Sequence, residues 1–233
     1  MNFAEQLRTI KGNVPKVHQA GYDDGAAAGG GGGDNHYDTF WDAYQQNGNR
    51  TNYAFAFAGA GWTDETFKPK YPLRIVGDAE CAFQKNAISE IPVALDISQC
   101  NSLHYAFAFC NNLVRLPRLD ISKVQSSVYA FRECYSLEEI ACLVFSENTK
   151  VDHNIFYNTS NLKHLTVEGT INTPFALYHC SVLSNESVQS IIDHLKDLTG
   201  ATAQTLTFHA TVGGKLTQAQ KDAISAKNWT LVY

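Results

Sequence analysis

The stretch HYAFAFCNNLVRLPRLDIS, residues 104–122, decides the fold because its opening phrase returns along the chain. Tyr105 begins YAFAFCNNL, Tyr129 begins YAFRECYSL, and Tyr53 begins YAFAFAGAGW. A catalytic motif usually occurs once, whereas a phrase that returns at a regular interval is typical of repeated architecture. The first expectation is therefore a protein built from stacked repeats.

The repeat is measured from one anchoring phenylalanine in each unit, namely Phe83, Phe107, Phe131 and Phe156. Apolar residues follow these anchors at constant offsets: Leu113, Leu137 and Leu162 at the first offset, Leu116, Ile140 and Leu165 at the second, and Leu95, Leu119 and Leu143 at the third. A period of about 24 residues with leucines at such offsets indicates leucine-rich repeats. Each unit is expected to supply one short strand, and a turn or short helix that carries the Ala-Phe pair. We therefore expect an α/β solenoid of leucine-rich repeats with helix and strand caps, since a single unit cannot bury its own apolar face.

Small residues recur three positions after the anchors, at Cys110, Cys134, Thr159 and Cys180. Equivalent positions of stacked repeats form ladders, so packing inside the stack is favoured over metal binding or nucleophilic chemistry. The six cysteines include no CxxC pair. Free, buried thiols are expected for all of them.

A second column stands just before the inner apolar residue of each strand and consists of Glu90, Arg115, Glu139 and His164. Neighbouring strands lie about 4.8 Å apart, so these side chains are expected to be cross-strand neighbours. One interpretation is a surface ladder in which each pair contributes at most about 1 kcal/mol. The other is a candidate exposed repeat face that contacts a ligand, and the ladder is favoured.

The segments outside the repeats divide the chain further. Residues 1–24 are expected to form an attachment or oligomerisation helix, because apolar residues follow a heptad pattern at Phe3, Leu7, Ile10, Val14 and Val17. The glycine-rich stretch 25–35 is expected to be a flexible linker. Residues 36–78 are expected to form an amino-terminal cap and a first degenerate repeat. The repeats proper are placed at 79–183.

Residues 184–233 are expected to form a carboxy-terminal α/β cap. SNESVQSIIDHLKDLTG is predicted to be an amphipathic helix that ends at Gly200, and QTLTFHA alternates as a strand does. A second helix is predicted in TQAQKDAISAKN, with Thr217 as the N-cap and Gln220 completing a capping box. WTLVY is predicted to be the last strand.

Composition and motif content exclude several function classes. The net charge is −5, and no basic stretch suggests nucleic-acid binding. No apolar run is long enough to cross a bilayer, and no signal peptide is recognised at the start. The eight histidines occur singly, with no HExxH or HxH pattern, and GxSxG is also missing. We expect neither an enzyme nor a cofactor-binding or metal-binding protein.

The A-F-x-x-C-x-x-L units resemble leucine-rich repeats of the BspA type. The flanks YDTFWDAYQQNGNRTNYAFAFAGAGWTDETFKPKYPLR and IIDHLKDLTGATAQTLTFHATVGGKLTQAQKDAISAKNWTLVY, and the start FAEQLRTIKGNVPKVHQAGYDDG, are similar to segments of tail-associated proteins from phages and prophages of Firmicutes. The resemblance implies a virion component at the tail tip or baseplate, assembled in the host cytoplasm and not secreted through a signal peptide. Its expected partners are other virion proteins, a second copy of itself in a homo-oligomer, and a host surface receptor or glycan.

Two alternatives stay open at this point. One is a bacterial cell-surface adhesin of the same repeat family, which would require export. The other is a cell-wall-degrading tail enzyme that uses two carboxyl groups about 5–9.5 Å apart, one of them with a raised pKa.

Overall fold

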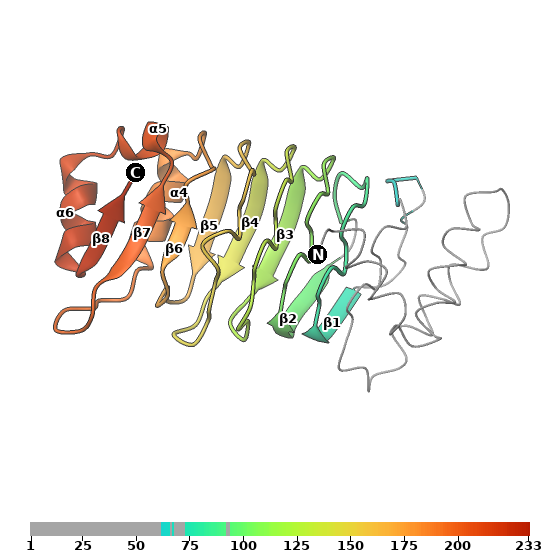
Figure 1. Cartoon of the computed structure of the whole chain (residues 1–233), viewed down its shortest axis with the longest axis horizontal. Helices are drawn as coiled ribbons and strands as arrows, with labels where there is room; N and C mark the ends of the chain where they lie inside the picture. Colours follow the sequence, from blue (N-terminus) through green and yellow to red (C-terminus); the bar gives the residue numbers. More distant parts are fainter. Residues whose placement is uncertain (1–61, 66, 68–72, 92–93) are drawn as a thin grey trace, which may run out of the picture.

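The computed structural model describes residues 62–65, 67, 73–91 and 94–233. Figure 1 shows the strands lying side by side along the long axis of the molecule, with the carboxy terminus near the left end of the view. The elements in chain order are β1 (Leu73–Asp78), β2 (Leu95–Ser102), β3 (Arg115–Asp120), β4 (Glu139–Val144), β5 (His164–Glu168), β6 (Phe175–Leu177), α4 (Asn185–Asp193), β7 (Gln204–Phe208), α5 (Ala210–Gly213), α6 (Gln218–Ala226) and β8 (Trp229–Val232).

Consecutive repeats run parallel and in the register that the sequence period predicts. Leu116 of β3 pairs with Ile140 of β4, and Ile140 pairs with Leu165 of β5. The turn segments between strands are also joined, since the Phe107 N–H donates to the Ala130 carbonyl 2.8 Å away. The backbone of each unit is thus hydrogen-bonded to the next unit both in the strand and in the turn.

The anchoring phenylalanines form a continuous column in the centre of the core. Phe107 stacks on Phe131 with ring centroids 5.5 Å apart and planes 13° from parallel. The pairs on either side, Phe83 with Phe107 and Phe131 with Phe156, are stacked in the same way at 5.1 and 5.3 Å. All four rings are buried. The predicted packing role of this position is confirmed.

The predicted α/β solenoid is wrong as a description of the fold. The described residues form three small parallel sheets, of the strands β1-β2, β3-β4-β5 and β6-β7-β8. Among the described residues there are three helices, of 9, 4 and 9 residues, and all three follow the repeats. Turns take the place of helices in the described repeats because left-handed residues interrupt the turn segment, in pairs four positions apart in three of the units, as at Tyr105 and Phe109 with φ of 53° and 63°.

The first break in the sheet, between β2 and β3, follows from a change of register and from a proline. Glu90 pairs with Arg115 and Ser102 pairs with Ser126 in isolated bridges, so the spacing changes by one residue between them. The Arg115 N–H points toward the β2 side and donates to the Ser89 carbonyl. Pro117 faces that same side two residues later but has no N–H to donate, so a regular ladder cannot continue.

The second break occurs because α4 covers the edge of β5. The Leu165 N–H donates to the Ser187 hydroxyl 2.8 Å away, and the Val167 N–H donates to the Ser190 hydroxyl 2.9 Å away. These side chains satisfy the backbone groups that a further strand would otherwise pair with. A helix laid on an edge is one of the ways in which sheets are ended.

The carboxy-terminal segment agrees with its sequence pattern in most respects. The predicted strands correspond to β7 and β8, and α6 carries the predicted capping box of Thr217 and Gln220. The predicted end of the first helix at Gly200 is wrong, because α4 ends at Asp193. Leu195 then bridges to Ile171, so a tertiary pairing replaces the last helical turns. The short helix α5 was not predicted.

Candidate functional site

The structure brings the four predicted residues of the exposed repeat face into one ladder on the strand side. Arg115 is the register partner of both Glu90 and Glu139, and Glu139 is the partner of His164. The Arg115 Nε lies 3.6 Å from Glu139 Oε2, and both side chains are well exposed. A pair of this kind contributes at most about 1 kcal/mol because water screens it. The five predicted attachment residues, Phe3, Leu7, Ile10, Val14 and Val17, lie outside the described residues.

A stronger ion pair on the same face spans two repeats. The guanidinium of Arg118 on β3 donates from Nε and Nη2 to Glu168 Oε2 on β5, at 3.2 and 2.8 Å, and so bridges over β4. This hydrogen bonding holds the pKa of the Glu168 carboxyl below its usual range. The pair could not be predicted from the sequence because its members occupy different offsets in units that are not adjacent.

An aromatic belt, defined as Tyr105, Tyr129, Tyr157 and His179, runs along the turn side of the stack. Successive ring centroids are 5.2, 5.8 and 4.6 Å apart. Each of these residues is half-buried, whereas the phenylalanine column behind them is fully buried. The molecule therefore carries two aromatic ladders, one inside the core and one that reaches the surface.

Arg132 lies in the middle of the belt. Its guanidinium carbon is 5.0 Å from the ring centroid of Tyr129 and 5.3 Å from that of Tyr157, and it also lies 5.2 Å from the ring of Phe109. Glu133 accepts hydrogen bonds from Arg132 Nε and Nη2 at 3.0 and 2.9 Å. This arrangement fixes a cation between aromatic faces at a partly exposed position.

The repeat register alone does not produce the belt. Tyr105 and Tyr129 stand two residues before their anchors, but Tyr157 stands one residue after its own. At the Tyr105 offset the first unit has Cys81, which shares the left-handed backbone with a φ of 54°. The turn therefore imposes the backbone conformation but not the aromatic side chain. The sequence period groups Tyr105 with Tyr129, but no periodic signal adds Tyr157 and His179 to them.

The buried cysteine column performs a structural task. The Cys110 and Cys134 thiols each donate to the carbonyl of the preceding anchor, Phe83 and Phe107, at 3.0 Å, and the Thr159 hydroxyl donates to the Phe131 carbonyl at 2.6 Å. Burial raises the pKa of Cys110 to about 12 and that of Cys134 well above its ordinary value. Since the thiolate is the reactive form, these residues are unsuited to nucleophilic chemistry.

No carboxyl group among the described residues has the clearly raised pKa that a general acid needs. In the described ranges the pKa shifts of carboxyl groups are all downward, at Asp96, Glu168, Glu186 and Asp197. For Asp197 the causes are hydrogen bonds from the side chain and backbone of Thr199. A glycosidase acid requires a shift in the opposite direction.

Within residues 62–65, 67, 73–91 and 94–233, no three His, Cys, Asp or Glu side chains come together as a metal site would require. In the same part of the chain, none of the helices has the length and apolar character of a membrane span. No protein-family model, curated protein or solved structure matches this sequence.

Proposed function

We propose that this chain is a structural and interaction protein of a phage virion, associated with the tail or baseplate, which displays its repeat surface for contact with a host receptor or another virion protein. The similarity of its flanking segments to those of phage tail-associated proteins supports the virion assignment. The arrangement of its surface side chains supports an interaction role that involves no catalysis.

The aromatic belt around Arg132 is the observation that carries the proposal. Tyrosine and arginine are enriched among the residues that dominate binding energy at protein interfaces. The rings of Tyr129 and Tyr157 are held by their neighbours and by the Arg132 guanidinium, so little side-chain freedom is left to lose on binding. By contrast, the strand face presents charges that already neutralise one another, as in the Arg118–Glu168 pair.

The test is a competition experiment in which the purified full chain is added before phage particles adsorb to host cells. Arg132→Ala is compared with Arg118→Ala, because each removes one guanidinium with an acidic partner, from the belt and from the strand face respectively. We expect Arg132→Ala to weaken competition about 30-fold, the effect of a hot-spot loss of about 2 kcal/mol, and Arg118→Ala to change it little.

Two results would count against the belt as the contact surface. One is a full-chain protein that folds normally but does not compete at all. The other is an equal loss of competition in both variants. The melting temperature of each variant shows whether its fold is intact. An Arg132→Lys variant keeps the charge and so provides a second, milder change at the same position.

A further inference from the structure

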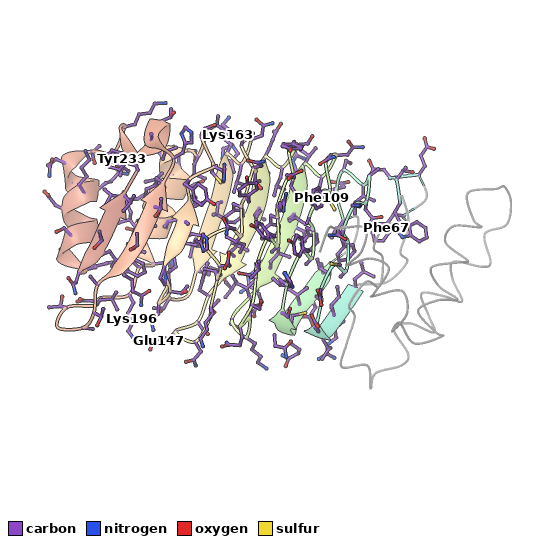
Figure 2. The ribbon with its side chains drawn as sticks, in the orientation of Figure 1. Phe67, Phe109, Glu147, Lys163, Lys196 and Tyr233 are labelled. Carbon is purple, nitrogen blue, oxygen red and sulfur yellow. The ribbon has the colours of Figure 1, made fainter. Side chains whose placement is uncertain are left out.

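A polar hollow of about 590 Å³ lies at the edge where the strands of the β3-β4-β5 sheet end. Its walls come from the loops of three successive units, with Gln125 from the first, residues 147–150 from the second and residues 172–174 from the third. Figure 2 labels Glu147 at this lower edge of the molecule, near Lys196. The aromatic belt lies on the turn side, so the hollow is a separate surface.

Amide side chains from both neighbouring units hold the central loop of the hollow in place. Gln125 Nε2 donates to the Asn148 carbonyl at 2.8 Å, and Asn172 Nδ2 donates to the Glu147 carbonyl at 3.1 Å. Lys196 Nζ lies 3.0 Å from Glu147 Oε2 and fixes that carboxylate. The polar walls are therefore ordered before any ligand arrives.

Two polar side chains that line the hollow have no partner among the described residues. The side-chain amide of Asn148 and the ammonium of Lys150 form no hydrogen bond or ion pair with the described residues, although the backbone of their loop is held in place. Behind Asn172, Gln204 donates to it from Nε2, and the buried Gln204 Oε1 has no partner in the described part of the chain. Buried polar groups are normally satisfied, so this edge is incompletely paired.

We propose that the hollow is a binding site for a saccharide. Sugar hydroxyls both donate and accept hydrogen bonds, as the side-chain amides of Asn148 and Gln125 also do. Seven of the eight residues that line the hollow carry a polar or charged side chain, which disfavours a lipid as the ligand. Glu147 and its partner Lys196 carry opposite charges, so Lys150 alone gives too little positive charge for a phosphate group to be favoured. Pro174 is the one apolar residue in the lining and offers a surface against which a sugar ring can lie.

This inference deepens the proposed function and rests on it for the source of the saccharide, a glycan on the host surface. The binding itself can be measured without any particle. A chain that binds saccharides through the hollow but is missing from virions contradicts the proposed function alone. A virion component whose belt competes for adsorption but whose hollow binds no sugar contradicts this inference alone.

The experiment titrates the isotope-labelled full chain with linear oligomers of glucose, of galactose and of N-acetylglucosamine, and with inorganic phosphate, while amide resonances are followed by NMR. We expect at least one oligosaccharide to shift the side-chain amides of Gln125, Asn148 and Asn172 in a saturable manner. The double variant Asn148→Ala/Lys150→Ala is expected to bind about tenfold more weakly or worse, as the loss of one or two hydrogen bonds predicts.

Asn111→Ala is the matched control, since Asn111 is an exposed asparagine in the turn of a different unit. It is expected to leave the affinity unchanged. The inference is overturned if none of the three oligosaccharides gives saturable shifts, or if the double variant binds as the unchanged chain does. It is also overturned if phosphate produces the same shifts more tightly than any sugar, because the hollow is then an anion site.

Discussion

The described repeats and the carboxy-terminal segment 184–233 both line up parallel strands, but they satisfy the backbone in different ways. In the repeats each unit is completed by an equivalent unit, as when Cys134 donates to the carbonyl of Phe107 in the unit before it. In the carboxy-terminal segment the partners are individual side chains, such as the Ser187 hydroxyl of α4, which accepts from a backbone N–H of β5, and the capping box that starts α6.

This difference shows how a stack is extended and how it is stopped. Extension needs the same kind of side chain at one offset of every unit, such as a small hydrogen-bond donor, because equivalent groups of successive units meet each other. Termination needs specific donors and acceptors that no repeat supplies, and α4 brings its serines to the open edge of β5 for that purpose. The effects of substitutions on the free energy of unfolding should therefore differ between the two regions, both in size and in physical cause.

The largest expected effect is in the phenylalanine column. Phe131→Ala removes a fully buried ring that stacks on both Phe107 and Phe156. We expect the free energy of unfolding to fall by about 3–5 kcal/mol, the usual cost of such a cavity. The control is Tyr135→Ala, four residues further along the chain. The Tyr135 side chain is 44% exposed, so its removal should change the free energy of unfolding little. A loss below about 1 kcal/mol for Phe131→Ala in urea unfolding would mean that the column is not core.

The next effect concerns the buried hydrogen bonds of the column that contains Thr159. Thr159→Val keeps the shape but leaves the Phe131 carbonyl without the donor that lies 2.6 Å away. The carbonyl then keeps only the longer hydrogen bond from the Cys134 N–H at 3.4 Å. Weakening a buried acceptor in this way is expected to cost about 1–3 kcal/mol. Thr159→Cys restores the thiol that occupies the preceding units and should recover most of the loss in the same denaturant titration. Equal stability of the Val and Cys variants would show that packing alone sets this position.

A smaller effect is expected in the carboxy-terminal segment. Thr217→Ala removes the N-cap of α6, whose hydroxyl accepts from the Gln220 N–H at 3.2 Å. The expected loss in the free energy of unfolding is about 1 kcal/mol. Thr217→Ser keeps the hydroxyl and serves as the control. If alanine and serine variants unfold at the same urea concentration, the capping box does not stabilise this end of the molecule.

The smallest effect is expected at the exposed Arg118–Glu168 pair, and it depends on pH. The Arg118 guanidinium lowers the pKa of Glu168 in the folded state, so its stabilising effect is complete above the unfolded-state pKa, about 4.3 for an ordinary glutamate. The effect is lost as the pH falls through the lower folded-state value. Arg118→Ala should therefore differ from the unchanged chain slightly at neutral pH and not at all in strong acid. A difference that grows on acidification contradicts this pairing.

The sequence was sufficient to predict those features that depend on a single repeated offset or on a local motif. The buried anchors, the packed column of Cys110, Cys134 and Thr159, and the capping box at Thr217 are features of this kind. The hydrogen bonds that this column donates were not predicted. The charge ladder was also predictable, because parallel strands in register must place Arg115 beside Glu139.

The division into sheets, the aromatic belt and the hollow could not be predicted, because each depends on contacts between residues at different offsets of different units. The division into three sheets follows from Pro117, from a one-residue change of register, and from serines of α4 that reach a strand more than twenty residues earlier. The aromatic belt combines rings from different offsets, and the hollow needs loops from three units at once. Neither surface could be predicted before the units were placed side by side.

The most direct test of the proposed function is to locate the chain in a lysate of phage-producing cells. Phage particles are purified on a density gradient, and peptides of this chain are quantified by mass spectrometry in the particles and in the washed cell envelope. We predict that the chain co-purifies with particles in a constant ratio to the other tail proteins. Its recovery in the envelope, with none in the particles, would contradict the proposal and favour a cell-surface adhesin.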